Sequence, residues 1–171
     1  NITQYISEIV DDFNIMNPID YCNNPTVNLI THRYYEICKK NNINFTISIK
    51  NANIDFIKEH DITALLDNLL ENAVESALMT NEKFIDFSIS TRNSNFVIIK
   101  ISNSCNKKPK YIDGTLVSSK STSGMHGIGT RSIKRVVEKY NGNLEMKFDN
   151  DTKTFTSVIG INSNLPSNNQ S

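Results

Sequence analysis

The chain has 171 residues, 18 of them basic and 18 acidic, so its formal net charge is zero. This length fits one domain with a core of its own. The charge balance leaves no basic footprint for a phosphate backbone, which argues against a dedicated nucleic-acid-binding protein. The 3 cysteines are far apart and form no CxxC pair, so we expect reduced thiols rather than disulfides or a zinc site.

Two kinds of hydrophobic periodicity alternate along the chain. Apolar residues at helical spacing predict helices at 2–13, 26–40, 59–79 and 129–140. Apolar and polar residues alternate in further segments and predict strands at 43–50, 84–90, 96–102, 143–149 and 154–161. Asn and Ser residues typical of a hairpin turn join the second and third strands, and Asn141-Gly142 ends the last helix.

The order of these elements predicts an α+β fold. Consecutive strand pairs between helices favour a two-layer α/β sandwich with a mixed, mainly antiparallel sheet covered on one face by helices. Residues 103–126 show no periodicity, and a stretch of this length inside a compact domain is typical of a lid or another functional loop. Residues 163–171 are polar and predict a disordered tail.

The ends of the sequence predict a piece of a longer protein. Asn1 lies within a helical pattern, with no initiator Met and no signal peptide before it. No apolar run approaches the roughly 20 residues of a membrane-spanning helix. We therefore expect a cytoplasmic domain, such as one belonging to a membrane receptor.

Two asparagines mark the long helix at 59–79. Asn68 and Asn72 share one side of the helix with Asp61 and Glu75, while leucines and alanines occupy the opposite side. One interpretation is an ordinary solvated face. Against it, asparagine is a poor helix former, and amide and carboxylate oxygens are hard ligands that suit Mg²⁺ together with phosphates.

A glycine-containing turn precedes the helix at 129–140. Gly127 and Gly129 flank Ile128, and Thr130 follows them. Glycines allow close approach of the backbone to a ligand, and the free N–H groups and dipole of a helix N-terminus favour an anion. Lys120 adds a positive charge for phosphates. The pattern is neither a P-loop nor a Rossmann turn, and simple loop closure is the alternative.

Together these segments resemble the GHKL (Bergerat-fold) ATPase superfamily, which includes histidine kinases and type II topoisomerases. Residues 65–77 (LLDNLLENAVESA) resemble its N box, and residues 126–133 (HGIGTRSI) resemble its second glycine box. Residues 23–49 and 118–129 resemble the peptide-sensing receptor kinases of Gram-positive bacteria, such as the accessory-gene-regulator receptor. The resemblance extends from about residue 20 to residue 161 and implies the ATP-binding catalytic domain of a sensor histidine kinase.

The resemblance also implies roles for individual residues. Asn72 matches the Mg²⁺-ligating asparagine, and Asn68 matches the position one turn earlier, which contacts phosphate or Mg²⁺-bound water. Lys120 matches the lid lysine, and with these two asparagines it forms the expected catalytic group. The expected nucleotide-binding residues are Asn68, Asn72, Glu75, Asn103, Lys120, His126, Gly127, Ile128, Gly129 and Thr130. An amide at position 68 cannot accept a proton usefully, which favours phosphotransfer over hydrolysis.

One family feature is altered. Most of these kinases carry a DxGxG box after the second hairpin strand, and its aspartate accepts the adenine amino proton. Here residues 102–106 are SNSCN, so Asn103 replaces the aspartate and the glycines are missing, as in the receptor-kinase subfamily. Asn103 can accept one hydrogen bond and donate another without a charge, so we expect adenine contact with binding weaker by about 1 kcal/mol.

Other polar candidates have simpler interpretations. His32 lies opposite the apolar stripe of its helix, and we expect an exposed surface histidine rather than a phosphoacceptor. His60 is expected near a helix N-cap. His126 either contacts a phosphate when protonated or anchors the lid by a hydrogen bond. Cys105 is expected as a small apolar residue near the pocket.

The predicted function is transfer of the γ-phosphoryl group of ATP, with Mg²⁺, to a histidine of a dimerisation domain outside this chain. A response regulator would receive the phosphate. The resemblance implies a linker helix at 1–20 and a catalytic domain at 21–162, within a membrane-anchored homodimer that serves quorum sensing. Two other functions remain open: a serine kinase of the anti-sigma-factor type, and a non-enzymatic GHKL domain that docks proteins.

Overall fold

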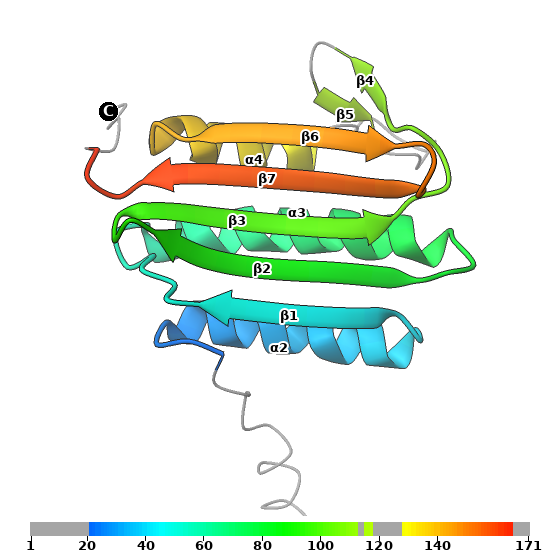
Figure 1. Cartoon of the computed structure of the whole chain (residues 1–171), viewed down its shortest axis with the longest axis horizontal. Coiled ribbons are helices and arrows are strands. Elements are labelled where there is room, and N and C mark those ends of the chain that lie inside the picture. Colours follow the sequence, from blue (N-terminus) through cyan, green and yellow to red (C-terminus); the bar gives the residue numbers. More distant parts are fainter. Residues whose placement is uncertain (1–20, 113–114, 118–127, 166–171) are drawn as a thin grey trace, which may run out of the picture.

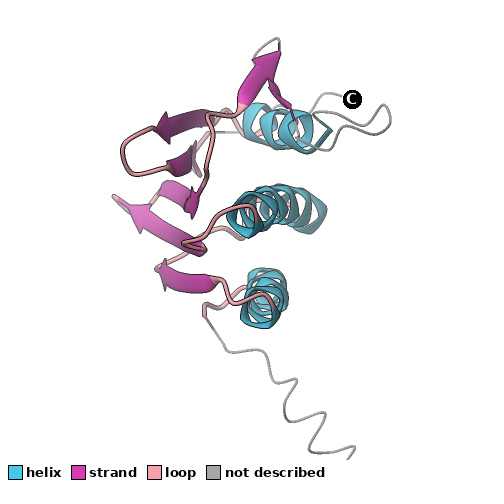
Figure 2. Cartoon of the chain, turned by 90° about the vertical axis from the view of Figure 1, so that its right-hand side faces the viewer, coloured by secondary structure: helices cyan, strands magenta, loops and turns pink. Residues whose placement is uncertain are grey.

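The computed structural model describes residues 21–112, 115–117 and 128–165. They form two layers, a five-stranded sheet and three helices that cover one of its faces (Figures 1 and 2). The helices are α2 (Pro25–Lys40), α3 (Glu59–Leu78) and α4 (Ile128–Lys139). The strands, in spatial order, are β1 (Asn44–Lys50), β2 (Phe84–Arg92), β3 (Phe96–Ser104), β7 (Thr154–Asn162) and β6 (Asn143–Asp149). The predicted α+β fold is confirmed, and the helix predicted at 2–13 lies outside the described residues.

The sheet is mixed because of one connection. β1 pairs with β2 in parallel, so α3 must cross over between them, whereas every other neighbouring pair is antiparallel. β3 is therefore the central strand, with β2 on one side and β7 on the other. This order places the end of β3 over the C-terminal half of α3, which lies behind the sheet in Figure 1.

The core lies between α3 and the sheet. The apolar side of α3 supplies fully or almost fully buried residues to it: Ile62, Leu65, Leu66, Leu69, Leu70 and Ala73. Alternate residues of β3, including Val97, Ile99 and Ile101, are buried beneath them. Each buried Leu, Ile or Val side chain among them contributes about 1.5–3 kcal/mol when it is removed from water. Because the apolar side of α3 packs on the sheet, the side that carries Asn68 and Asn72 faces α4 or the edge of the helix layer.

The ends of the helices follow the expected chemistry. Asn24 caps α2 by accepting a hydrogen bond from the Val27 backbone N–H at 3.1 Å, and Pro25 is its first residue. After α4, Asn141 adopts a left-handed φ of 51° and the Gly142 N–H donates to the Val137 carbonyl at 2.8 Å. This confirms the predicted helix stop.

One segment differs from the sequence-based expectation. Residues 103–126 show no periodicity, yet they include the short antiparallel strands β4 (Lys110–Ile112) and β5 (Thr115–Val117). Each strand has 3 residues, which is too short for an alternating pattern to appear in the sequence.

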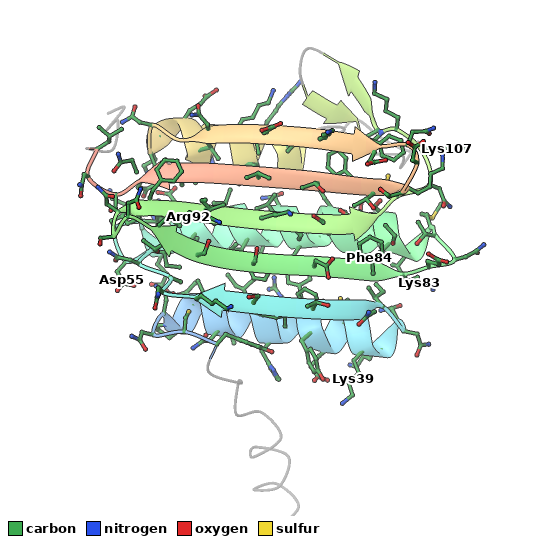
Figure 3. The ribbon with its side chains drawn as sticks, viewed as in Figure 1. Lys39, Asp55, Lys83, Phe84, Arg92 and Lys107 are labelled. Carbon is green, nitrogen blue, oxygen red and sulfur yellow. The ribbon has the colours of Figure 1, made fainter. Side chains whose placement is uncertain are left out.

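The second face of the sheet bears mainly short polar side chains (Figure 3). Within this face, Ser102 and Thr156 share a hydrogen bond of 2.9 Å between their hydroxyl groups. Figure 3 places Asp55 and Arg92 at one end of the sheet, and Phe84 and Lys107 at the other. The latter end is where β3 finishes.

Candidate functional site

The N-terminus of α4 lies against the amide side of α3. A Cβ atom on Gly129 would lie 2.8 Å from Asn68 Oδ1, so the α4 backbone and this oxygen are in close contact. The Asn68 Nδ2 group donates to the Ala64 carbonyl at 2.6 Å, one turn earlier in the same helix. That bond fixes the amide with its oxygen towards α4. Only glycine allows this approach without displacement of the asparagine.

A second amide lies at the other end of the same side of α3. Asn103 follows Val97, Ile99 and Ile101 in the alternation of β3, and it is only 3% exposed. Its Nδ2 group donates to the Ser104 carbonyl at 2.9 Å. The Ser76 hydroxyl, from α3, donates to that carbonyl at 3.1 Å. Asn103 and the C-terminal half of α3 therefore meet at one backbone oxygen.

These contacts define a polar line along α3. Asn68, Asn72 and Ser76 follow one another at intervals of four residues, so they lie on one side of the helix and span about 12 Å. Asn72, in the middle, is exposed, and Glu75 beside it is half-buried. One end of the line faces the start of α4, where a helix N-terminus favours anions. The other end meets the buried amide of Asn103. This arrangement suits an elongated ligand with an anionic end.

The structure describes only part of the predicted site. Thr130 is buried within the first turn of α4, and Ile128 is the first residue of that helix. Lys120, His126 and Gly127 lie outside the described residues. The stretch of chain expected to close over a nucleotide is therefore not placed.

Comparison with known proteins identifies this arrangement. A family model described as the GHKL domain matches residues 57–161, which include α3, the whole of β3 and α4. The chain belongs to the GHKL family. The segment of the match begins with the helix that carries both asparagines and ends in β7.

This GHKL domain is similar to part of one curated sensor kinase. A probable C4-dicarboxylate sensor kinase of Bacillus subtilis is 29% identical over 112 residues, which are 61% of this chain and 20% of that kinase. The chain therefore corresponds to about a fifth of that relative's length.

Solved structures share the fold at low sequence identity. The nucleotide-free catalytic domain of the histidine kinase ThkA has a TM-score of 0.62 and 18% identity, over 82% of this chain and 92% of that one. For the mycobacterial sensor histidine kinase MprB, the TM-score is 0.58 with 14% identity, over 78% and 93% of the two chains. The fold of this chain is that of the catalytic domains of histidine kinases, and GHKL domains of such kinases bind ATP.

A buried carboxylate holds α3 and α4 together away from the polar line. Asp61 Oδ2 accepts from Lys139 Nζ at 2.6 Å and from the Tyr140 hydroxyl at 2.7 Å. The Tyr140 oxygen in turn accepts from the Lys58 backbone N–H at 2.9 Å. Helical periodicity placed Asp61 on the same stripe as Asn68 and Asn72. The structure shows instead that α4 covers Asp61, which is 7% exposed and has a structural role.

The ionisation of this group reflects its partners. Burial by itself raises the pKa of Asp61, but hydrogen bonds from Lys139 and Tyr140, with the charges of Lys139 and His60, outweigh burial and hold the pKa below its usual value. Burial, followed by the hydrogen bond and charge of Asp61, raises the pKa of Tyr140 to about 12, against an opposing effect of the Lys58 N–H. At neutral pH the pair is therefore a carboxylate bound to a neutral phenol.

Several single-residue expectations have clear outcomes. His32 was predicted to be exposed, but it is half-buried. Its ring stacks on Tyr35 with centroids 6.4 Å apart, and its Nδ1 atom is buried. His60 lies at the start of α3 as expected, two residues after the N-cap residue Lys58. Its Nε2 atom lies 3.3 Å from Asp61 Oδ1. Cys105 is buried as expected, and its thiol donates to the Lys107 carbonyl at 3.1 Å.

The polar contacts at Ser76 were not foreseen. Ser76 stands four residues after Asn72, so the helical spacing contained a usable signal. Its partner Ser104 is 28 positions away in the sequence. Ser104 also bonds through its side chain, whose hydroxyl lies 2.9 Å from that of Thr80. No local pattern links residues this far apart.

A shallow cavity of about 320 Å³ lies elsewhere, at the N-terminal end of α3. Two carboxylates line it, and both are engaged: Asp55 accepts from Asn24 at 3.0 Å and Glu59 accepts from Thr26 at 3.1 Å. Glu59 is separated from Asn72 by about 20 Å along the helix. The cavity is therefore distinct from the polar line.

Proposed function

We propose that this GHKL domain binds Mg-ATP along the polar line of α3 and transfers the γ-phosphoryl group to a histidine outside the chain. One observation carries the proposal: Asn68 Oδ1 faces the Gly129 backbone at the start of α4, with Asn72 one turn further along α3. This geometry supports phosphates at the N-terminus of α4 and the base towards Asn103. The close approach explains why residue 129 is a glycine, which simple loop closure does not explain.

Each end of the line has a separate task. Backbone N–H groups of Gly127, Gly129 and Thr130 would bind phosphate oxygens, and the α4 dipole favours their charge. Lys120 would add a fixed positive charge, and His126 a contact from the same loop. Asn103 would contact adenine. Positioning and charge neutralisation are the main contributions that a protein makes to phosphoryl transfer.

The donor atoms fit Mg²⁺ bound together with a nucleotide. Within the described ranges, no three His, Cys, Asp or Glu residues come together to hold a metal ion. An ion here would need phosphate oxygens and water to complete its oxygen ligands, with the exposed Asn72 as the protein ligand and Glu75 beside it. When bound, Mg²⁺ supplies charge neutralisation at the phosphates.

The amide at position 68 supports a kinase rather than a hydrolase. An ionised carboxylate there could remove a proton from water, but an amide cannot. A neutral histidine needs no such base, because the lone pair of its unprotonated ring nitrogen attacks phosphorus directly. The N–P bond forms as the bond from the γ-phosphorus to the bridging oxygen breaks, and ADP leaves with that electron pair.

Substitution of Asn72 tests the site. We expect Asn72→Ala to lower phosphorylation of a separately supplied dimerisation domain by about 100-fold or more, as removal of a transition-state contact does. Asn81→Ala is the matched control, since Asn81 is also exposed and lies in the turn after α3. Phosphate incorporation from radiolabelled ATP measures the rates. Equal transfer by the two variants would contradict the proposed site.

The other two functions give different results in the same system. A serine kinase of the anti-sigma-factor type would leave an acid-stable phosphate on a partner, whereas phosphohistidine is lost in acid. A docking domain would show no heat with millimolar Mg-ATP in calorimetry. The altered box around Asn103 is the feature that favours this last alternative.

We further infer the setting of the whole protein. The resemblance of residues 23–49 and 118–129 supports a peptide-sensing kinase of the accessory-gene-regulator type, active in quorum sensing. In that setting 1–20 is a linker helix, 21–162 is the cytoplasmic catalytic domain, and 163–171 is a tail. The full protein would be a membrane-anchored homodimer that phosphorylates a response regulator. Within the described residues, no helix is long and apolar enough to cross a membrane. Phosphotransfer from the full-length kinase in vesicles to candidate regulators tests this setting.

A further inference from the structure

Asp61 occupies the position in α3 from which an acidic side chain often caps its own helix. Lys58 is the N-cap residue, and Asp61 is the third residue of the helix. In a capping box, the side chain at this third position accepts a hydrogen bond from the backbone N–H of the N-cap residue. Here the Lys58 N–H donates to the Tyr140 hydroxyl at 2.9 Å, and that hydroxyl donates to Asp61 Oδ2 at 2.7 Å. Tyr140, which directly follows α4, is therefore inserted into the cap of α3.

The start of α3 is tied to the end of α4 by a second bond as well. Lys139, the last residue of α4, donates to Asp61 at 2.6 Å. At the opposite end of α4, the backbone at Gly129 lies close to Asn68 Oδ1. The two helices thus meet at two polar points, which are about 10 Å apart along α3.

The contacts between these two points are apolar. Ile133, Val136 and Val137 of α4 are at most 2% exposed and belong to the same core cluster as the leucines of α3. Apolar contacts supply attraction without a preferred direction, whereas hydrogen bonds are directional. The polar contact at each end therefore fixes where α4 lies along α3 and which way it points.

We propose that Asp61 is a positioning residue for nucleotide binding, because it holds the end of α4 and thereby fixes the start of this helix against Asn68. The inference rests on the proposed function, which assigns the phosphates to the N-terminus of α4. A Cβ at residue 129 would lie only 2.8 Å from Asn68 Oδ1, so a displaced helix would change the spacing that the phosphates meet. Asp61 lies about 10 Å from Asn68 along α3 and acts through α4.

Substitutions of Asp61 test this role without any ligand. Asp61→Ala removes both hydrogen bonds, whereas Asp61→Asn retains an oxygen that can accept from Tyr140. In NMR spectra of the whole ligand-free chain, the backbone amide resonance of Gly129 should shift most in the alanine variant and less in the asparagine variant. Residue 129 lies about 15 Å from Lys139 along α4, so a local disturbance at Asp61 would not reach it. If the alanine variant is unfolded, the asparagine variant carries the comparison.

Ile30→Ala is the matched control for a general loss of stability. Ile30 is 4% exposed and lies in α2, on the far side of α3 from α4 (Figure 1). Its truncation also lowers the stability of the fold. Because α2 packs on α3 and β1, this truncation does not act at the end of α4, and the Gly129 resonance should stay in place.

Calorimetry with Mg-ATP measures the consequence for binding, at a temperature at which the variants are folded. We expect Asp61→Ala to weaken binding about tenfold and Asp61→Asn to weaken it less. In a chain that already carries Gly129→Ala, the effect of Asp61→Ala should fall below about threefold, because the start of α4 is already displaced. Independent effects of the two substitutions would instead multiply.

The outcomes separate the two proposals. An unmoved Gly129 resonance, an unchanged ATP affinity or multiplying effects would each overturn the positioning role of Asp61 and leave the proposed function intact. An equal shift of the resonance in Ile30→Ala would also overturn it. Absence of Mg-ATP binding by the unmodified chain would overturn both proposals. A graded shift that follows the affinity, with Ile30→Ala unchanged in both measurements, supports the inference.

Discussion

Replacement of Asp61 by asparagine measures how strongly α3 and α4 are held together. The side chain of Asp61 is 10% exposed and that of Lys139 is 26% exposed. Asp61 accepts hydrogen bonds from Lys139 and Tyr140 at 2.6 and 2.7 Å. The substitution keeps the shape of the side chain and removes its charge, so the bond from Tyr140 becomes a neutral one and the contact with Lys139 loses its ion-pair attraction.

The expected loss follows from these two bonds. Hydrogen bonds to a charged group contribute about 1.5–3 kcal/mol, and neutral bonds contribute about 0.5–1.5 kcal/mol. The difference is about 1–1.5 kcal/mol for the Tyr140 bond. Loss of the ion pair with Lys139 adds about 1 kcal/mol or less, because solvent screens this partly exposed side chain. Asp61→Asn should therefore lower the free energy of unfolding by about 2 kcal/mol at pH 7. Asp86→Asn, on the exposed side of β2, should change it by less than about 0.5 kcal/mol.

The pH dependence has a definite sign. Because the folded-state pKa of Asp61 is lowered, its stabilising contribution is present above the unfolded-state pKa of about 4 and is lost as the pH falls through the folded-state value. Urea unfolding followed by circular dichroism measures both proteins at pH 7 and at lower pH. The gap between the unmodified chain and Asp61→Asn should narrow as the pH falls below about 4. A gap absent at pH 7, or undiminished in acid, would refute this account of the contact.

Three further predictions concern close packing and burial. Gly129→Ala places a Cβ 2.8 Å from Asn68 Oδ1, so it should weaken Mg-ATP binding about tenfold in calorimetry; unchanged binding would contradict the role of this approach. Gly142→Ala places a Cβ 2.9 Å from the Gly160 carbonyl, so urea unfolding should show a loss of about 2 kcal/mol, and full stability would show that the turn adapts. Burial raises the pKa of Cys38 to about 11, so iodoacetamide at pH 8 should leave Cys38 unmodified until the chain unfolds, as mass spectrometry can determine.

The sequence was informative wherever the cause of a structure is local. Periodicity located the three helices and the five strands of the main sheet in the described chain, because each of them buries one side and exposes the other. The pair Asn141-Gly142 correctly marked the end of α4, since the left-handed conformation that ends a helix suits these residues. The spacing of Asn68 and Asn72 placed both amides on one side of α3. These features depend on neighbours within a few residues.

Contacts between distant segments were outside the reach of such patterns. A helical wheel assigned Asp61 to a polar stripe but gave no information on what covers it, and its partner Tyr140 is 79 positions away. The β4–β5 strands were missed because 3 residues show no alternation. The sequence showed that Asn103 replaces the family's aspartate, but it did not show that Asn103 shares the Ser104 carbonyl with Ser76 of α3.

The sequence by itself determined which residues form the three helices and the main sheet, which sides are apolar, and that amides and glycines occur at spacings suited to phosphate and metal. Only the tertiary structure decided that Gly129 lies against Asn68, that Ser76 and Asn103 share the Ser104 carbonyl, and that α4 buries Asp61. The physical reason is that periodicity reports how a segment divides between protein and solvent. The partner that a polar atom finds depends on which segments the sheet order brings together.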